Sequence, residues 1–339
     1  MTVRVAIIDD SAFFREVLRE LLAAAPDLEV VGEAGDGRRA VELVMELRPD
    51  VVTMDVLLPL VGGLDAIRAI MARRPTPIIV LSRLVGRGQQ LGLDAIAAGA
   101  LDVLEKPLAG LDADHRRRLI ELVRGAARAH LPPARPPPPR PPRALPVRGR
   151  PRAIGVVAST GGPQLVRDAL AGLPAGYPIP IVVVQHTVAG FAAPMASWFD
   201  AATPLAVTVA VDGRPLAAGE VAVAPDDEHV IVDRAGVLRR RSGPAEAGHR
   251  PSGTALLRSL AEAFGPAAMG VVLTGMGKDG ADGLAAIAHG GGLAVVQDPA
   301  DAAIDAMPRR ALAAVPGATA VTAAELPALL RSVAHQGAR

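Results

Sequence analysis

The first 130 residues alternate between short apolar runs and amphipathic segments, and this alternation restricts the fold more than any other feature of the sequence. The runs predict five strands, at Val3–Ile8, Leu28–Gly32, Asp50–Met54, Pro77–Leu81 and Ala100–Leu104. The other segments predict five helices, at Ala12–Ala24, Gly37–Leu47, Gly63–Arg73, Gly88–Ala98 and Asp112–Ala129. Because parallel strands need helical crossovers, the pattern predicts an α/β fold with a doubly wound, five-stranded parallel sheet. Ligands of such sheets bind beyond the carboxyl ends of the strands.

A proline- and arginine-rich segment divides the chain. Residues 131–152 contain ten prolines, six arginines and no acidic residue. Since proline blocks both helix and ladder hydrogen bonds, this composition predicts an extended linker. It is either a solvated spacer or an electrostatic contact for an acidic partner. We therefore expect one domain at 1–130 and a second at 153–339.

The second domain also alternates between strand and helix patterns. Buried, mostly parallel strands are predicted at Ile154–Ala158, Ile179–Gln185, Ala267–Thr274 and Leu293–Gln297. Short valine-rich runs at 205–240 predict a small antiparallel part of this α/β domain. The most apolar stretch, 311–330, contains two prolines and a glutamate, so it predicts a strand and a helix rather than a membrane span. We expect no membrane insertion.

The composition excludes several classes of function. Lys+Arg 36 balances Asp+Glu 35, whereas a general nucleic-acid-binding protein shows a basic surplus. The chain has no cysteine, which excludes a disulfide framework, a thiolate metal site and a cysteine nucleophile. The first eight residues lack the basic region of a signal peptide. We expect a cytoplasmic protein.

Charged and hydroxyl side chains stand at the ends of four predicted strands in the first domain. Asp9 and Asp10 follow the first strand, Asp55 follows the third, Ser82 ends the fourth, and Lys106 follows the fifth. Crowded carboxylates need a cation, and Mg²⁺ prefers such oxygen ligands. A carboxylate beside Mg²⁺ and a lysine ammonium can attack a phosphoryl group. The hydroxyl would then donate a hydrogen bond to the new phosphoryl oxygens.

Residues 1–130 resemble the response-regulator receiver domain. The resemblance rests on DDSAFFR, VTMDVLLP, Ser82 and EKP. It implies that Asp55 is phosphorylated and that Asp10 and Asp55 hold Mg²⁺. It also implies that Asp9 assists through water and that the backbone carbonyl of Leu57 is a further metal ligand.

Three strands of the second domain lead into residues typical of a hydrolase. The first runs into ASTGGP with Ser159, the second ends in His186, and the third runs into LTGMGKDGADG with Asp279 and Asp282. A strand–turn–helix presents a nucleophilic hydroxyl close to helix N–H groups; the alternative is a phosphate-binding or N-capping turn. Because the carboxyl ends of parallel strands meet at one edge, the set predicts a Ser-His-Asp triad, which is recognised by geometry rather than chain order.

Three further histidines are rival bases. His229 precedes a predicted strand, His249 lies in an arginine-bearing loop that can line the site, and His289 is placed late in a helix. No pair of histidines has the HExxH spacing of a metallohydrolase.

Residues 153–335 resemble the catalytic domain of the chemotaxis protein-glutamate methylesterases. The resemblance rests on ASTGGP, QHTVAGF, VAPDDEHV, HRPS, LTGMGKDGADG and MPRRAL, and on the order of receiver, linker and esterase. It implies the triad Ser159, His186 and Asp279. It also implies that Thr160 and the backbone N–H of Met276 stabilise the oxyanion. Departures from the family pattern stand at Thr187, Thr254 and Asp305.

The two resemblances together imply a phosphorylation-activated hydrolase that removes methyl groups from glutamate methyl esters of chemoreceptors and deamidates receptor glutamines. The implied partners are the cytoplasmic helices of a chemoreceptor as substrate and a histidine kinase as phosphodonor. The implied cofactor is Mg²⁺ at the receiver site, with none needed by the esterase. The alternative is a catalytically weak or inactive regulator that binds receptors. A DNA-binding output is disfavoured because residues 153–339 hold no basic recognition helix. We expect a monomer.

Overall fold

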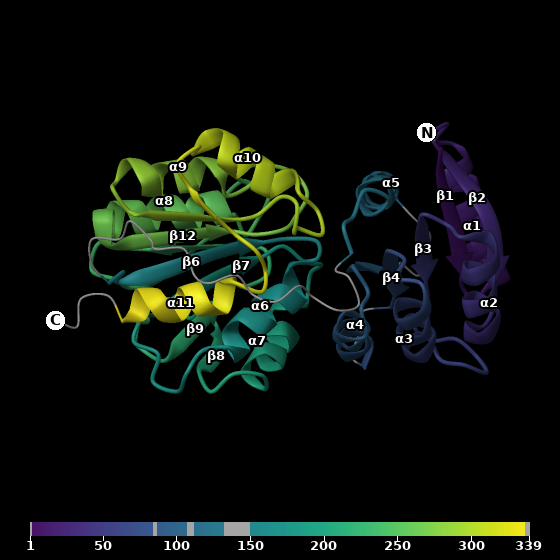
Figure 1. The fold of residues 1–339 in the computed structure, drawn as a ribbon, viewed down its shortest axis with the longest axis horizontal. Coiled ribbons are helices and arrows are strands. Elements are labelled where there is room, and N and C mark those ends of the chain that lie inside the picture. The colour runs from purple at the N-terminus through teal and green to yellow at the C-terminus, as the bar shows by residue number, and fades with distance from the viewer. Residues whose placement is uncertain (1, 84–86, 107–111, 132–149, 336–339) are drawn as a thin grey trace. The chain divides into compact units, whose positions relative to one another are not determined.

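The computed structural model describes residues 2–83, 87–106, 112–131 and 150–335. The chain separates into two compact units, residues 1–135 and 136–339 (Figure 1). Most of the predicted linker, 132–149, lies outside the described residues.

The first unit is a five-stranded parallel sheet in the order β2-β1-β3-β4-β5, so the predicted doubly wound fold is confirmed. Its strands are β1 (Val3–Ile8), β2 (Leu28–Ala34), β3 (Val51–Met54), β4 (Ile78–Ser82) and β5 (Asp102–Glu105). Its helices are α1 (Ala12–Ala23), α2 (Gly37–Leu47), α3 (Gly63–Arg73), α4 (Arg87–Ala97) and α5 (Ala113–Ala126). α5 ends before the predicted Ala129 because the backbone there tightens into a three-residue turn, in which Arg128 N donates to Gly125 O.

Capping side chains begin several of these helices. Ser11 Oγ accepts a hydrogen bond from Phe14 N at 3.3 Å, and Asp36 and Asp112 cap α2 and α5 in the same way. A cap satisfies one of the unpaired N–H groups in the first turn. The cap at Ser11 begins α1 directly after Asp9 and Asp10 and so fixes the turn that carries these two carboxylates.

The second unit is built on a seven-stranded sheet in the order β14-β13-β12-β6-β7-β9-β8, in which every neighbouring pair is parallel. Its strands are β6 (Ala153–Ala158), β7 (Ile181–Gln185), β8 (Ala206–Val209), β9 (Glu220–Val223), β12 (Ala268–Val272), β13 (Leu293–Gln297) and β14 (Thr319–Val321). Its α-helices are α6 (Gly162–Ala171), α7 (Ala192–Asp200), α8 (Gly253–Phe264), α9 (Ala281–His289), α10 (Ala306–Ala314) and α11 (Leu326–Ala334). In Figure 1, α8, α9 and α10 cover one face of the sheet, and α6, α7 and α11 cover the other.

The predicted antiparallel part is smaller than the region 205–240. Only β10 (His229–Val232) and β11 (Leu238–Arg241) form an antiparallel hairpin. β8 and β9 lie in this region too, but they are parallel and extend the main sheet. The connection at 210–219 returns the chain to the end of the sheet at which β8 begins, so β9 runs parallel to β8.

The core of the second unit consists mostly of aliphatic side chains. The residues of β6 and β7 are buried, as expected for strands covered on both faces. At Gly155 of β6, a Cβ atom would come within 2.6 Å of Leu260 and 2.7 Å of Leu257, so glycine allows α8 to pack tightly on the sheet. The hydroxyl of the buried Tyr177 donates to Leu330 O at 2.7 Å and ties α11 to the loop before β7.

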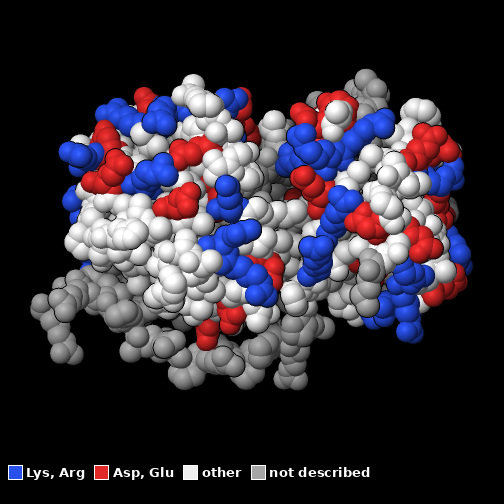
Figure 2. Space-filling view, turned by 90° about the horizontal axis from the view of Figure 1, so that it is seen from above, with Lys and Arg blue, Asp and Glu red and all other residues white. Residues whose placement is uncertain are grey.

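Charged side chains of both signs are interspersed over the visible surface of each unit, as Figure 2 shows. Many form ion pairs, such as Arg39 with Glu46 in the first unit and Arg239 with Asp233 in the second. None of the helices in the described ranges is both long and apolar enough to span a membrane.

Candidate functional site

An acidic cluster lies at the carboxyl edge of the first sheet. Oxygen atoms of Asp9, Asp10 and Asp55 lie within 4.8 Å of one another. Asp9 and Asp55 are buried, whereas Asp10 is exposed. Lys106 reaches both buried carboxylates, with Nζ 2.6 Å from Asp9 Oδ2 and 2.7 Å from Asp55 Oδ2.

Backbone N–H groups hold the other oxygens of the two buried carboxylates. Ser11 N donates to Asp9 Oδ1 at 2.9 Å, and Leu57 N donates to Asp55 Oδ1 at 3.0 Å. Each carboxylate therefore has one oxygen bound to the backbone and the other bound to Lys106. The cluster is built by the turns after β1 and β3, and the side chain of Leu57 is half exposed beside it.

The environment of this cluster sets its charge. Burial raises the pKa of the Asp9 carboxyl above its ordinary value, although Lys106 opposes that shift. Burial alone would lower the pKa of the Lys106 ammonium, but its hydrogen bonds to Asp55 and Asp9 outweigh burial and raise it. Lys106 is therefore a cation at neutral pH. Its Nζ also lies 4.5 Å from the centroid of the Phe14 ring, a cation–π contact that the sequence analysis did not predict.

Ser82 lies at the end of β4 beside this cluster. Its neighbour across the sheet is Glu105, and Lys106 N donates to Ser82 O at 2.9 Å. The side chain is buried, yet Oγ makes no hydrogen bond with any residue in the described ranges. Buried hydroxyls are rarely left unpaired, so this atom has the donor capacity that an incoming oxygen-rich group would use.

The acidic cluster fits a bound Mg²⁺. Three carboxylates with a single lysine leave an excess of negative charge, and all the facing ligand atoms are oxygen. Hard divalent cations prefer such a set. Asp10, which is exposed, also leaves room for the water molecules that Mg²⁺ retains.

Ser159 stands in the turn between β6 and α6 at the edge of the second sheet. Its backbone N donates to Thr274 O at 3.0 Å, and its carbonyl accepts from Gly162 N at 2.8 Å and from Gln185 Nε2 at 2.8 Å. Gly161 has a φ of 77°, which a residue with a side chain rarely adopts, and so allows the turn into α6. α6 begins at Gly162.

His186 follows β7, beside Ser159. Ala158 and Gln185 are paired residues of neighbouring strands, and His186 N donates to Ala158 O at 2.9 Å, so Ser159 and His186 leave the sheet side by side. The imidazole Nε2 lies 2.9 Å from Asp279 Oδ2. Nδ1 is buried and makes no hydrogen bond with any described residue, Ser159 included.

Asp279 is fully buried in the loop before α9 and is held by several donors. Ser252 Oγ and Thr254 N each donate to Oδ1 at 2.9 Å, and Gly253 N donates to Oδ2 at 2.6 Å. Burial alone would raise the pKa of the carboxyl, but its bonds with His186 and Thr254 outweigh burial and hold the pKa well below its ordinary value. Asp279 is therefore ionised, and an ionised carboxylate fixes a neutral His186 as the tautomer with hydrogen on Nε2.

The two loops that carry Ser159 and Asp279 meet at Gly275. A Cβ atom there would come within 2.5 Å of Ser159 Cβ, so glycine allows the loops to approach. Met276, one of the predicted oxyanion donors, is the next residue of this loop. Thr160, the other predicted donor, is buried, and its carbonyl accepts from Thr274 Oγ1 at 3.0 Å.

The alternative acid and the three rival histidines lie outside the hydrogen bond between His186 and Asp279. Asp282 is exposed in the first turn of α9. His229 is buried with both ring nitrogens engaged, by Pro244 O at 3.0 Å and Ser252 N at 3.2 Å, and His289 is exposed at the end of α9. His249 stacks face to face on His186, with ring centroids 3.9 Å apart and planes 5° apart.

Sequence reasoning missed the donors that hold Asp279. It treated Thr254 only as a departure from the family pattern, but its N–H holds Asp279 and its Oγ1 accepts from Gly280 N at 2.9 Å. The signal was present, because Ser252 precedes an apolar helical pattern and is a typical N-cap. Ser252 does cap α8, with its Oγ accepting from Ala255 N.

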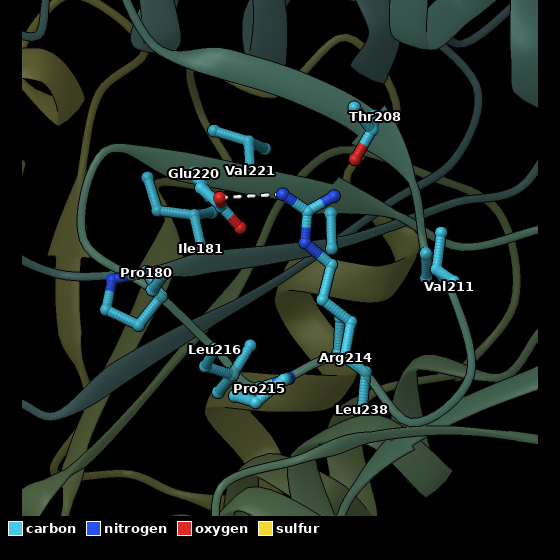
Figure 3. Close-up of a pocket in the computed structure, with 13 residues that line it drawn as sticks. Pro180, Ile181, Thr208, Val211, Arg214, Pro215, Leu216, Glu220, Val221 and Leu238 are labelled. Carbon is cyan, nitrogen blue, oxygen red and sulfur yellow. Dashed lines mark hydrogen bonds and ion pairs between the residues drawn. The ribbon is translucent and has the colours of Figure 1, made fainter.

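A hollow of about 210 Å³ lies next to this site. Gln185 and Thr187, on either side of His186, line it, together with Asp226, Arg250 and Met195. Thr187, one of the departures from the family pattern, therefore forms part of the wall of this hollow. A second hollow, drawn in Figure 3 around the Arg214–Glu220 ion pair, holds only about 10 Å³, room for roughly one water molecule.

Comparison with known proteins finds a matching family for each unit. Residues 154–330 match the family model of the CheB methylesterase, and residues 5–115 match that of the response regulator receiver domain. A protein-glutamate methylesterase/protein-glutamine glutaminase of Anaeromyxobacter dehalogenans is 45% identical over 92% of this chain and 93% of its own length. A relative of the same name from Myxococcus xanthus is 43% identical over 97% of this chain and 93% of its own length.

A solved structure resembles the second unit. The Thermotoga maritima CheB methylesterase catalytic domain has a TM-score of 0.52 and 29% identity, covering 55% of this chain and all of that domain (100%). The matches extend over both units, and the polar residues at their strand ends occupy the matched regions. The chain belongs to the CheB methylesterase family.

Proposed function

We propose that this protein hydrolyses glutamate methyl esters on the cytoplasmic helices of chemoreceptors and deamidates receptor glutamines. Relatives that are 43–45% identical along nearly the whole chain carry the name protein-glutamate methylesterase/protein-glutamine glutaminase. The observation that carries the proposal is the hydrogen bond between His186 and the buried Asp279. His186 leaves the sheet next to Ser159. This arrangement supports a Ser-His-Asp triad at the carboxyl edge of the second sheet.

The proposed chemistry is acyl transfer through Ser159. Nδ1 of His186 takes the hydroxyl proton as Oγ attacks the ester carbonyl carbon, and Asp279 stabilises the imidazolium that forms. The C–O bond to the methoxy group then breaks, and His186 returns the proton to release methanol. Water, deprotonated by the same ring, next breaks the acyl–Ser159 bond and leaves glutamate. With a glutamine side chain, ammonia leaves instead of methanol.

The oxyanion of the tetrahedral intermediate needs hydrogen-bond donors. We assign this role to Thr160, the residue after Ser159, and to the backbone N–H of Met276, which follows Gly275 in the loop that meets Ser159. The N–H groups of the first turn of α6 point toward the same edge of the sheet. Removing a single oxyanion donor typically lowers kcat by ~100–1000-fold.

The side chains at the proposed triad are poorly arranged to bind a metal ion, which supports an esterase that needs none. His186, His249 and Asp279 place ligand atoms within 4.8 Å of one another. However, the two rings are parallel within 5°, so their in-plane lone pairs cannot converge on a single ion without a ring turning. Several hydrogen bonds already occupy Asp279.

The receiver unit supplies the proposed control. Asp55 is the phosphorylation site, and Asp10 and Asp55, with the carbonyl of Leu57, would hold Mg²⁺, while Asp9 would act through water. Mg²⁺ would neutralise charge on the phosphoryl group that is transferred. Lys106, already 2.7 Å from Asp55, would pair with a phosphoryl oxygen, and the unpaired Ser82 hydroxyl would donate to another.

Phosphorylation adds about −1.5 to −2 charge at Asp55. We propose that this charge activates the esterase, that a histidine kinase is the phosphodonor, and that the protein acts in the cytoplasm. A regulator that only binds receptors would share this receiver, so hydrolysis must be measured directly.

The test is methanol release from methylated chemoreceptor membranes. Wild type is compared with Ser159→Ala and Asp55→Asn, each with and without a small phosphodonor. We expect Ser159→Ala to release no methanol and Asp55→Asn to keep the basal rate without stimulation. Methanol release by Ser159→Ala would refute the triad, and an inactive wild type would favour the receptor-binding regulator.

A further inference from the structure

A second imidazole lies on the ring of the proposed general base. The rings of His249 and His186 are 3.9 Å apart between centroids and 5° from parallel. From its sequence position, His249 is predicted to be a rival base in a loop that can line the site. Its ring covers one face of His186, whose side chain is 8% exposed.

We propose that His249 is a positioning residue for the hydrolysis. Its flat ring holds the imidazole of His186 in the plane that joins Nε2 to Asp279 and leaves Nδ1 for Ser159. This inference rests on the proposed esterase function and adds the residue that orients its general base.

The hydrogen bond to Asp279 does not fix the plane of the His186 ring by itself. The last torsion of a histidine side chain has broad energy minima, and a ring held at one nitrogen can still tilt about that bond. Among the described residues Nδ1 has no partner, so no second hydrogen bond restricts the tilt. A parallel aromatic face restricts it, because tilting loses the stacking contact.

The backbone around His249 is built to hold its ring in place. Glu246 and His249 exchange two backbone hydrogen bonds, at 3.0 and 3.1 Å, across a tight turn. The central residues of the turn, Ala247 and Gly248, have φ of 54° and 87°, as a type I′ turn requires. Alanine adopts this left-handed conformation at a cost in free energy, and such strain is typical of functional sites. His249 Nδ1 also lies 3.2 Å from Ala247 O, which fixes the edge of the ring.

The segment from His249 to Thr254 contacts two members of the proposed triad, His186 and Asp279. Its first residue covers His186, and Ser252, Gly253 and Thr254 donate to Asp279. One short stretch of chain therefore sets the ring plane and the carboxylate together. A Cβ atom at Gly277 would lie 3.7 Å from His249 Cε1, so the loop that carries Asp279 also borders this ring.

The experiment compares His249→Leu with His249→Phe in the full-length protein. Both side chains fill the space, but only phenylalanine presents a flat ring to His186. We expect His249→Leu to lower kcat for methanol release roughly two- to tenfold with KM unchanged, since that range matches a lost aromatic pair. We expect His249→Phe to restore kcat to near the wild-type value. His289→Leu, at an exposed helix end, is the matched control and should behave as wild type.

Three results would overturn the proposal. Wild-type kcat in His249→Leu would show that the ring is not needed, and an equal loss in His249→Phe would show that imidazole chemistry, not a flat face, is required. A rise in KM with unchanged kcat would also count against it, because that pattern belongs to substrate binding. An inactive wild type would instead refute the proposed esterase function. Failure of the role proposed for His249 can therefore be distinguished from failure of the esterase function.

Discussion

His186 Nε2 lies 2.9 Å from Asp279 Oδ2, while Nδ1 of the same ring makes no hydrogen bond with any described residue. Nδ1 is thus the nitrogen left for Ser159 in the proposed mechanism, with the carboxylate bound at the opposite nitrogen. In the chymotrypsin triad the carboxylate instead binds Nδ1 and the serine hydroxyl faces Nε2.

Replacing the carboxylate tests this arrangement. Asp279→Asn keeps the shape, but its amide group no longer holds hydrogen on Nε2 of His186. We expect kcat for methanol release to fall about 10⁴-fold, as a wrong tautomer does in serine proteases. Steady-state kinetics checks this, with Asp282→Asn as the matched control because Asp282 is an exposed aspartate in the following helix. A comparable loss in Asp282→Asn would mean that the wrong carboxylate has been assigned.

Removing divalent cations separates the two sites. A chelator should abolish the stimulation by a small phosphodonor, because the acidic cluster around Asp55 loses its ion. The basal rate of ester hydrolysis should not change, since the proposed triad needs no metal. Both rates are measured by methanol release before and after Mg²⁺ is restored. Loss of the basal rate on chelation would contradict the metal-free mechanism.

The contact between the Ser159 and Asp279 loops predicts a stability effect. A methyl group at Gly275 would meet Ser159 Cβ at 2.5 Å and Met307 Sδ at 2.3 Å. We expect Gly275→Ala to lower the free energy of unfolding by about 1–3 kcal/mol, as overpacking usually does, and to lower kcat as well. Denaturant unfolding measures the first quantity. Gly317→Ala is the control, because nothing lies within 4 Å of its added carbon, and it should not be destabilised.

Tyr177 is the only tyrosine, so its ionisation can be followed separately. Burial raises the pKa of its hydroxyl far above the ordinary value. A raised pKa in the folded state means that this contribution to stability is complete below pH of about 10 and is lost as the pH rises further. We therefore expect phenolate absorbance to appear above that pH only as the protein unfolds. Phenolate absorbance in a protein whose circular dichroism is still native would contradict this prediction.

Sequence patterns predicted the arrangement of strands well because strand ends and turn glycines leave strong local signals. The runs ending at Ile8, Met54 and Gln185 are strands that end at these residues. The positions of Ser159 and His186 then follow, since parallel neighbours end at the same edge. The parallel pairing of β8 and β9 could not be predicted, because short valine-rich runs carry no information about strand direction.

Contacts between distant segments were harder to predict. The stacking of His249 on His186 depends on a tight turn that brings together residues far apart in sequence. The cation–π contact of Lys106 with Phe14 likewise joins α1 to the residue that follows β5. Neither pair has a characteristic spacing along the chain, so only the folded structure reveals them.

Ser252 caps the N-terminus of α8, and its Oγ also donates to Asp279 Oδ1. The same oxygen accepts a hydrogen bond from Thr254 N. The first turn of α8 is thus part of the proposed hydrolytic site. Fraying of that turn would release the carboxylate while the seven-stranded sheet stays intact, and helix ends are where local opening needs the least free energy. On warming, the enzyme should therefore lose its hydrolytic activity at a lower temperature than the one at which it unfolds.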